Sequence, residues 1–414
     1  MSKRRRISRS FRLISESKFI LYYSLVERVF FFLFFLVIAR RFQVDSYGEL
    51  ITGFAIANAS ALMFDLGVPI HLQKEISSGK FTEKLLPSAV TLNLALLPLF
   101  LLAALSIGII AYNIPMSLML MICTPVYLFS GSNLISKALA GFGDFRSQFN
   151  SVVKSRIPLL VFLAIFYFTE QSSLLPYLIA LAAGALAQMT MLIGKIKTRI
   201  KITPGFLKGL STIRDLLTVL PLGAAVALNF LYDKIDILLI SKMLGFTESA
   251  IYSIAYGLFK SASLSYTFFL IPALSKISYF SRRKSAVRLF LAKYTFNIFL
   301  ICIFVTVALV ISADFIVELL YGEKFGESAN ILKVLSFVTL GMGLNNLFGV
   351  ALNGLGLYKE NLYVTFTGLI INVVLNLMLI PTMGIMGAVI ATLATEYLVL
   401  AGDSFYLNNF LRKA

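Results

Sequence analysis

Runs of about twenty consecutive apolar residues, each followed by a short polar break, recur along the whole chain, and we count twelve of them in 414 residues. At 1.5 Å per residue, a helix of about twenty residues spans the ~30 Å hydrocarbon core of a bilayer. The runs are apolar at consecutive positions, as in FFLFFLVIA at 31–39. This pattern excludes the two-residue alternation of barrel strands. The sequence therefore predicts an all-α polytopic membrane protein, because in lipid a helix satisfies its own backbone polar groups.

The twelve predicted spans cover almost the whole chain. They are 18–40, 48–70, 86–111, 116–139, 152–169, 174–194, 215–241, 249–272, 294–320, 328–353, 361–381 and 384–410. Charged residues make up only 14% of the chain, whereas a soluble domain carries about 25%. No predicted connection is long enough to hold a soluble domain, so we look for function among the rare polar groups inside the spans.

The basic residues are unevenly distributed between alternate loops. The net charge is +17, and 27 of the 37 Lys and Arg residues fall in the tail 1–18, every second loop and the C-terminus. The loops between them hold four. By the positive-inside rule this predicts cytoplasmic N- and C-termini. We therefore attribute the positive charge to the orientation of the protein in the membrane and to contact with anionic membrane lipids, and not to binding of nucleic acid.

A basic segment at 195–214 divides the predicted spans into two sets of six. We predict a basic tail at 1–17, an N-terminal six-helix bundle at 18–194 and a C-terminal one at 215–414. The stretches ARRFQVDSYGELITGFAIA and ISKMLGFTESAIYSIAYGLF follow the first and seventh spans and resemble each other. Six spans per bundle give both the same orientation, so we expect parallel repeats around a central cavity that carries the substrate.

Two basic residues fall near the centres of their spans, Arg28 in the first and Lys260 in the eighth. A charge at mid-bilayer is costly and persists where it faces a cavity or a partner. Tyr252, Tyr256 and Lys260 follow one another at four-residue spacing, so they share one helix face. Ammonium and tyrosine groups suit a ligand that carries phosphate and sugar. The alternatives are a pair between Arg28 and Glu27 and a snorkelling Lys260.

Three further basic residues lie near the inner ends of the fourth and fifth spans: Lys137, Lys154 and Arg156. They are candidates for substrate contact at the inner mouth of a cavity. Snorkelling to the head groups explains them equally well.

Four acidic residues inside spans are candidates for ion coupling: Asp65, Asp233, Asp236 and Glu396. Buried carboxylates beside water can carry protons or bind Na⁺. They can also pair with Lys234, Arg28 or Lys260. Asn372 and Asn376, one turn apart, are expected to join helices by hydrogen bonds.

Signatures of enzymes and of resident cofactors are absent from the sequence. Cys123 and Cys302 have no metal-ligand spacing, His71 is the only histidine, and there is no P-loop or GxGxxG motif. The sequence therefore predicts a transporter rather than an enzyme, with no cofactor except a coupling H⁺ or Na⁺.

Four segments in order resemble one family of transporters. They are IARRFQVDSYGEL (38–50), KIDILLISKMLGFTESAIYSIAYGLFK (234–260), LLYGEKFGESANILKVLSF (319–337) and NVVLNLMLIPTMGIMGAVIATLATE (372–396). They resemble the polysaccharide-biosynthesis, or O-antigen flippase, family of the multidrug/oligosaccharidyl-lipid/polysaccharide (MOP) flippase superfamily. The resemblance implies two six-helix bundles around a cationic cavity, as in the multidrug (MATE) transporters. It also implies flipping of undecaprenyl-diphosphate-linked oligosaccharide, in a pathway with a polymerase and a chain-length regulator, and it places Arg28 and Lys260 in the cavity.

Two other functions stay open at this stage. A MATE-type multidrug or cation antiporter of the same superfamily would favour an acidic cavity, which the basic mid-span residues argue against. An integral-membrane polymerase or glycosyltransferase usually carries a large outer loop. The longest predicted outer loop has only about eight residues.

Overall fold

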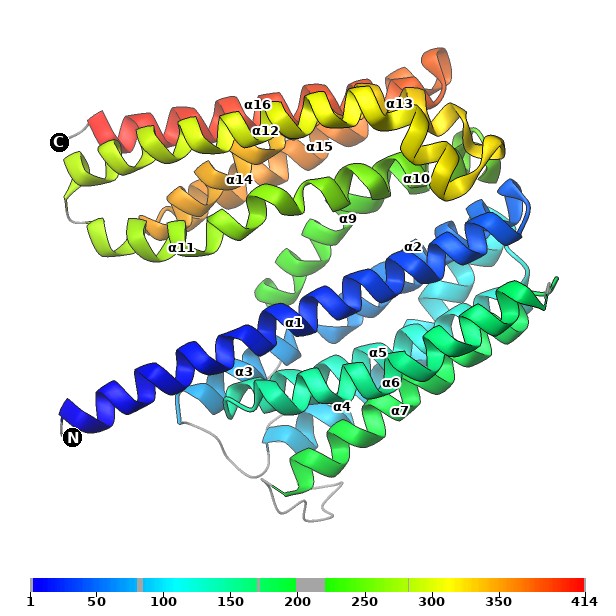
Figure 1. The fold of residues 1–414 in the computed structure, drawn as a ribbon, viewed down its shortest axis with the longest axis horizontal. Coiled ribbons are helices and arrows are strands. Elements are labelled where there is room, and N and C mark those ends of the chain that lie inside the picture. Colours follow the sequence, from blue (N-terminus) through cyan, green and yellow to red (C-terminus); the bar gives the residue numbers. More distant parts are fainter. Residues whose placement is uncertain (1–2, 80–84, 170–171, 199–219, 282, 413–414) are drawn as a thin grey trace. The chain divides into compact units, whose positions relative to one another are not determined.

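The computed structural model describes residues 3–79, 85–169, 172–198, 220–281 and 283–412 (Figure 1). Regular structure in this part of the chain is entirely helical. The helices before the basic segment are α1 (Lys3–Arg41), α2 (Val44–Asp65), α3 (Val68–Ser77), α4 (Leu85–Ser106) with a π-helical turn (Ile107–Ala111), α5 (Met116–Gly141), α6 (Phe145–Phe168) and α7 (Leu175–Lys197). Those after it are α9 (Leu220–Met243), α10 (Phe246–Ala262), α11 (Leu264–Phe280), α12 (Lys284–Tyr321), α13 (Glu327–Leu335), α14 (Val338–Gly354), α15 (Tyr358–Met383) and α16 (Ile385–Arg412).

Eight of these helices are long and apolar enough to cross a membrane, and three bent helix pairs raise the number to eleven within the described ranges. The bent pairs are α2 with α3, α10 with α11, and α13 with α14. The predicted all-α membrane fold is thus confirmed. The seventh predicted span corresponds to α9, which carries four charged residues between Asp233 and Lys242 and is not among the eleven. The number twelve therefore stays a prediction.

The backbone divides into two compact units. Unit 1 consists of Met1–Gln43 and Thr52–Leu231, and unit 2 of Val44–Ile51 and Tyr232–Ala414. The predicted bundles at 18–194 and 215–414 stay a prediction, and most of the linker at 195–214 lies outside the described residues.

Unit 1 is held together by packing of α5 against α3, α4 and α7, and of α1 against α6. Its core cluster is formed by Leu and Ile side chains, including Leu72 of α3, Leu139 of α5 and Leu192 of α7, all completely buried. Close packing of such side chains supplies the dispersion energy that holds helices together in lipid.

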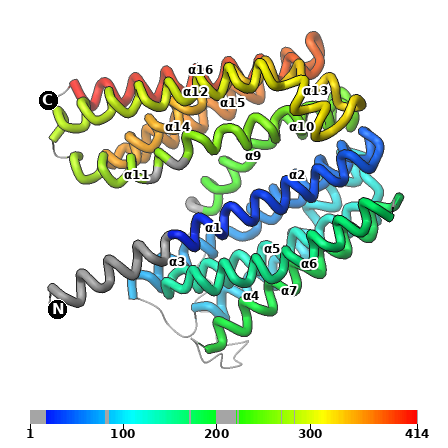
Figure 2. The backbone as a smooth tube through the Cα atoms, in the orientation of Figure 1, coloured from blue at the N-terminus to red at the C-terminus, as the bar shows by residue number. Residues whose placement is uncertain are grey.

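In unit 2 the last helix is central, since α16 packs along both α15 and α14 (Figure 2). Small residues allow close approach here: a Cβ on Gly387 would lie 2.3 Å from the Leu379 carbonyl oxygen. A second core cluster joins α11, α12 and α14 around Tyr266, Cys302 and Leu347. This packing fixes the faces of α14 and α16 that carry the polar residues described below.

Candidate functional site

Two lysines contact the carboxylate of Asp233: Lys234, its neighbour on α9, and Lys260, which the turn from α9 to α10 brings close. Lys260 Nζ lies 2.6 Å from Asp233 Oδ1, and Lys234 Nζ lies 3.1 Å from Asp233 Oδ2. The Tyr256 hydroxyl donates to Asp233 Oδ1 at 2.8 Å. Both ammonium groups lie over the Tyr256 ring, 5.4 and 5.3 Å from its centroid. The cluster, with two cations for one anion, carries net positive charge, and the side chains of Lys260 and Asp233 stay 28% and 30% exposed.

Asp236, one turn further along α9, has a different environment. It is 5% exposed, and its carboxylate accepts hydrogen bonds from the Tyr252 hydroxyl at 2.8 Å, the Thr392 hydroxyl at 2.6 Å and the Asn376 amide at 2.8 Å. Asn376 Nδ2 also donates to Asn372 Oδ1 at 3.1 Å. Asn376 thus joins α15 to α9, as expected, while its bond to Asn372 lies within α15, and α9, α10, α15 and α16 meet at Asp236. Every hydrogen-bonding neighbour of this carboxylate is neutral.

Glu396 of α16 forms a third carboxylate site. It is 4% exposed, and it accepts hydrogen bonds from the Tyr232 hydroxyl and the Asn345 amide, both at 2.9 Å. Thr392 was expected from its spacing to share a helix face with Glu396. Tyr232 and Asn345 were not singled out from the sequence, and the available signal for Tyr232 was its position beside Asp233.

Arg156 of α6 is a buried cationic residue of unit 1. Its Nη2 donates to Glu27 Oε1 and to Gln188 Oε1, both at 2.8 Å, and the side chain is 1% exposed. The guanidinium also lies 4.7 Å from the Phe129 ring centroid and 5.0 Å from that of Phe30. Snorkelling therefore does not describe Arg156, which joins α6 to α1 and α7 inside the unit.

The other basic candidates of unit 1 are not gathered around Arg156. Arg28 is exposed, and its Nε donates to Ser24 Oγ at 3.4 Å, while its neighbour Glu27 pairs with Arg156. Lys137 is half-buried and Lys154 is exposed. Their predicted contact with substrate stays a prediction.

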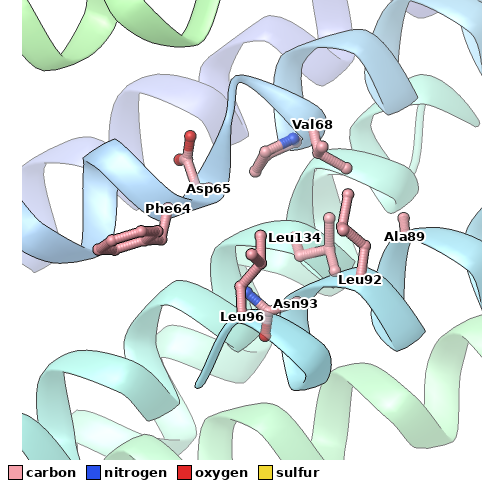
Figure 3. Close-up of a pocket in the computed structure, with 9 residues that line it drawn as sticks. Phe64, Asp65, Val68, Ala89, Leu92, Asn93, Leu96 and Leu134 are labelled. Carbon is pink, nitrogen blue, oxygen red and sulfur yellow. The ribbon is translucent and has the colours of Figure 1, made fainter. Parts of the chain in front are cut away.

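Asp65 lies at the bend between α2 and α3, which turns the chain by 47°. Leu66 and Gly67 there adopt positive φ angles of 53° and 74°, and Asp65 Oδ1 accepts the Gly67 N–H at 2.8 Å. Figure 3 shows Asp65 and Asn93 among the residues that line a small pocket. Its hydrogen bond gives Asp65 a structural role in the bend, and its predicted role in ion coupling stays a prediction.

Solved structures share this arrangement of helices. An inward-facing multidrug resistance MATE family transporter of the MOP superfamily matches with a TM-score of 0.79 and 14% identity, over 93% of this chain and 95% of that chain. The lipid II flippase MurJ, in an inward closed conformation, matches with a TM-score of 0.73 and 14% identity, over 94% of this chain and 87% of that one. At these identities the likeness concerns the fold, and it confirms the MATE-like architecture expected from the sequence.

Sequence relatives point the same way. An uncharacterized membrane protein of Methanocaldococcus jannaschii is 24% identical over 413 residues, covering 93% of this chain and 95% of the relative. The profile of the family described as "Polysaccharide biosynthesis protein" matches residues 16–278, which is more than half of the chain. The family expected from the four sequence segments is thereby confirmed. With its apolar helices and its flippase-like fold, this chain is a multi-pass membrane protein that belongs to the polysaccharide biosynthesis protein family.

Proposed function

We propose that the protein flips a polyprenyl-diphosphate-linked oligosaccharide, of the undecaprenyl type, from the cytoplasmic to the outer leaflet of a bacterial inner membrane. Family membership supports a role in polysaccharide biosynthesis. O-antigen or a related surface polysaccharide is the proposed product. A polymerase and a chain-length regulator would then act on the flipped unit in the same pathway.

The observation that carries the substrate class is the pair of lysines on Asp233. Lys260 and Lys234 hold their ammonium groups over one tyrosine ring while staying partly exposed. A diphosphate can replace Asp233 as their counter-ion, because lysine binds phosphate as a mobile point charge. The exposed or half-buried basic residues of unit 1, Arg28, Lys137 and Lys154, are proposed as further contacts along the substrate path.

The buried carboxylates are the proposed site of ion coupling. Asp236 accepts only from neutral donors, and Glu396 accepts from Tyr232 and Asn345. An ionised carboxylate in such a site is stabilised by binding H⁺ or Na⁺. Binding of that ion would favour one conformation of an alternating-access cycle and so reset the transporter.

The test is complementation of a strain that lacks the gene. Lys260→Ala should abolish surface polysaccharide at unchanged protein level and leave lipid-linked oligosaccharide in the inner leaflet, while Lys260→Arg keeps the charge and part of the activity. Lys333→Ala is the matched control, since Lys333 pairs with the exposed Asp314 at 2.7 Å. Normal polysaccharide with Lys260→Ala would reject the assignment of this residue. Loss of drug resistance with intact polysaccharide would favour the multidrug antiporter instead.

A further inference from the structure

Unit 2 contains a buried carboxylate that the sites above do not use. Asp403 of α16 is 1% exposed, and its Oδ1 has no hydrogen-bond partner among the described residues. Isolated ionised carboxylates are among the most costly groups to bury, and such a group takes up a proton or a cation instead. Its position in the fold decides what the group can do.

Asp403 continues a line of polar residues along one face of α16. Thr392, Glu396 and Asp403 follow at spacings of four and seven residues, which places them on the same side of the helix. Thr392 binds Asp236, so the three carboxylates Asp236, Glu396 and Asp403 form a column inside unit 2. At 1.5 Å per residue, the step from Glu396 to Asp403 is ~10 Å along the axis.

The facing helix α14 carries matching positions at four-residue spacing. Asn345 binds Glu396, Gly349 lies beside Asp403, and Asn353 Oδ1 accepts from the Asn361 amide of α15 at 3.0 Å. A Cβ on Gly349 would lie 3.6 Å from Asp403 Oδ2 and 3.3 Å from Asn361 Oδ1, so the two oxygens converge on one point beside this glycine. Because Asn361 donates its amide to Asn353, its oxygen is left to accept a proton donor.

Among the residues that the structure describes, no cationic partner for Asp403 is found in the helices packed around it. Glu396 acts on Asp403 electrostatically and has the same sign of charge. Lys284 of α12 lies over the Phe410 ring, 4.7 Å from its centroid, and Lys333 of α13 binds Asp314. The remaining charged residues of α13, α15 and α16 are Glu327, Lys359, Glu360 and Arg412, and α14 has none. Neutralisation by a proton therefore accounts for Asp403 better than an ion pair.

We propose that Asp403 is a proton-binding site, and that it forms the end of the carboxylate column nearest the C-terminus of α16. Asn353 and Asn361 are half-buried at the ends of α14 and α15, beside the connection between these helices. The loop charges predict that this end is cytoplasmic, so protons reach Asp403 from the cytoplasm and pass towards Glu396 and Asp236. The role in coupling rests on the proposed flippase function, whereas the binding site itself does not.

The site can be tested without transport. The full-length protein in detergent is treated with dicyclohexylcarbodiimide, which reacts with protonated carboxyl groups in apolar surroundings, and labelled peptides are identified by mass spectrometry. Asp403 should be labelled, with labelling that falls as pH rises and is the same in Na⁺ and choline buffers. Exposed Asp314 is the internal control and should remain unlabelled. Protection of Asp403 by Na⁺ would overturn the proposal and indicate a sodium site.

A second measurement does not depend on access of the reagent. Infrared difference spectra between acidic and alkaline pH should contain the carbonyl band of a protonated carboxyl group. Asp403→Asn should remove one component of this band, while Asp236 and Glu396 still contribute to it, and Asp314→Asn should leave that component in place. Absence of both the label and that component would overturn the proposal.

The link to transport has its own readout. In proteoliposomes with an imposed pH gradient, Asp403→Asn should lose proton-driven flipping and keep its binding of polyprenyl diphosphate. If the wild-type protein is labelled at Asp403 but moves no lipid-linked oligosaccharide, the proposed function fails and the proton site stands. Flipping by Asp403→Asn at the wild-type rate would overturn the role of this site in coupling.

Discussion

Arg156 of α6, which is buried, and Glu27 of α1, which is 21% exposed, form an ion pair with an N–O distance of 2.8 Å, 129 positions apart in the sequence. Gln188 shares the same Nη2 at 2.8 Å, so one guanidinium ties three helices of unit 1 together. Removing one member of a buried pair leaves the other uncompensated, which costs about 3–5 kcal/mol.

We expect Glu27→Ala to lower the thermal midpoint of the purified protein markedly, because the partners that Arg156 then keeps, the Gln188 amide oxygen, the Ser155 hydroxyl and aromatic rings, are all neutral. Arg28→Ala is the matched control on the same helix and should leave the midpoint nearly unchanged, since Arg28 is exposed. Thermal unfolding in detergent measures both. Equal effects of the two substitutions would show that the pair does not stabilise unit 1.

Asp233 is expected to compete with the diphosphate for the two lysines. Asp233→Asn removes the negative charge beside Lys260 and Lys234 while keeping a similar side-chain shape. The affinity for a polyprenyl diphosphate should rise by up to about tenfold, or ~1.4 kcal/mol. Release of the lipid should then slow, and flipping should slow with it. Equilibrium binding to purified protein gives the affinity. Weaker binding would mean that Asp233 positions the lysines rather than competing for them.

Thr392→Val replaces the hydroxyl that donates to Asp236 Oδ2 at 2.6 Å with a methyl group of similar size. Hydrogen bonds to charged groups are worth about 1.5–3 kcal/mol, so the thermal midpoint should fall. Thr392→Ser keeps the donor and should recover most of the loss. Thermal midpoints measured in Na⁺ and choline buffers at several pH values also identify the coupling ion, because an ion that binds the folded protein stabilises it. Equal thermal midpoints for Thr392→Val and Thr392→Ser would contradict the assigned hydrogen bond.

Gly48 allows the segment Val44–Ile51 to pack against α10 within unit 2. A Cβ at this position would lie 1.8 Å from the Phe246 carbonyl oxygen, so Gly48→Ala must displace the backbone. Hydrogen exchange of Val44–Ile51 and of the first turn of α10 should rise. Gly257→Ala is the control, because nothing lies within 4 Å of a Cβ there, and it should stabilise α10 by about 1 kcal/mol. Unchanged exchange with Gly48→Ala would refute the close packing of this segment.

The sequence predicted which side chains of α10 share a helix face, but it could not reveal their hydrogen-bond partners. The four-residue spacing of Tyr252 and Tyr256 placed them correctly on one face, and their rings stack with centroids 5.7 Å apart. Their hydroxyls bind Asp236 and Asp233, which the spacing within α10 could not reveal because the acceptors lie on α9. Arg156 was placed near a membrane surface from its position in the span. Its burial depends on Glu27 and Gln188, which come from two other helices.

By itself, the sequence determined that this chain is a membrane protein of apolar helices, because the length and hydrophobicity of each run are local properties that a bilayer selects directly. Four ordered segments also determined its family. Only the tertiary structure decided which carboxylate meets which donor. Asp233 meets the two lysines and Asp236 a set of neutral groups, whereas Asp403 Oδ1 has no partner within the described part of the chain. These differences depend on helix register and rotation, which are set by packing between segments distant in sequence rather than by the pattern within any one of them.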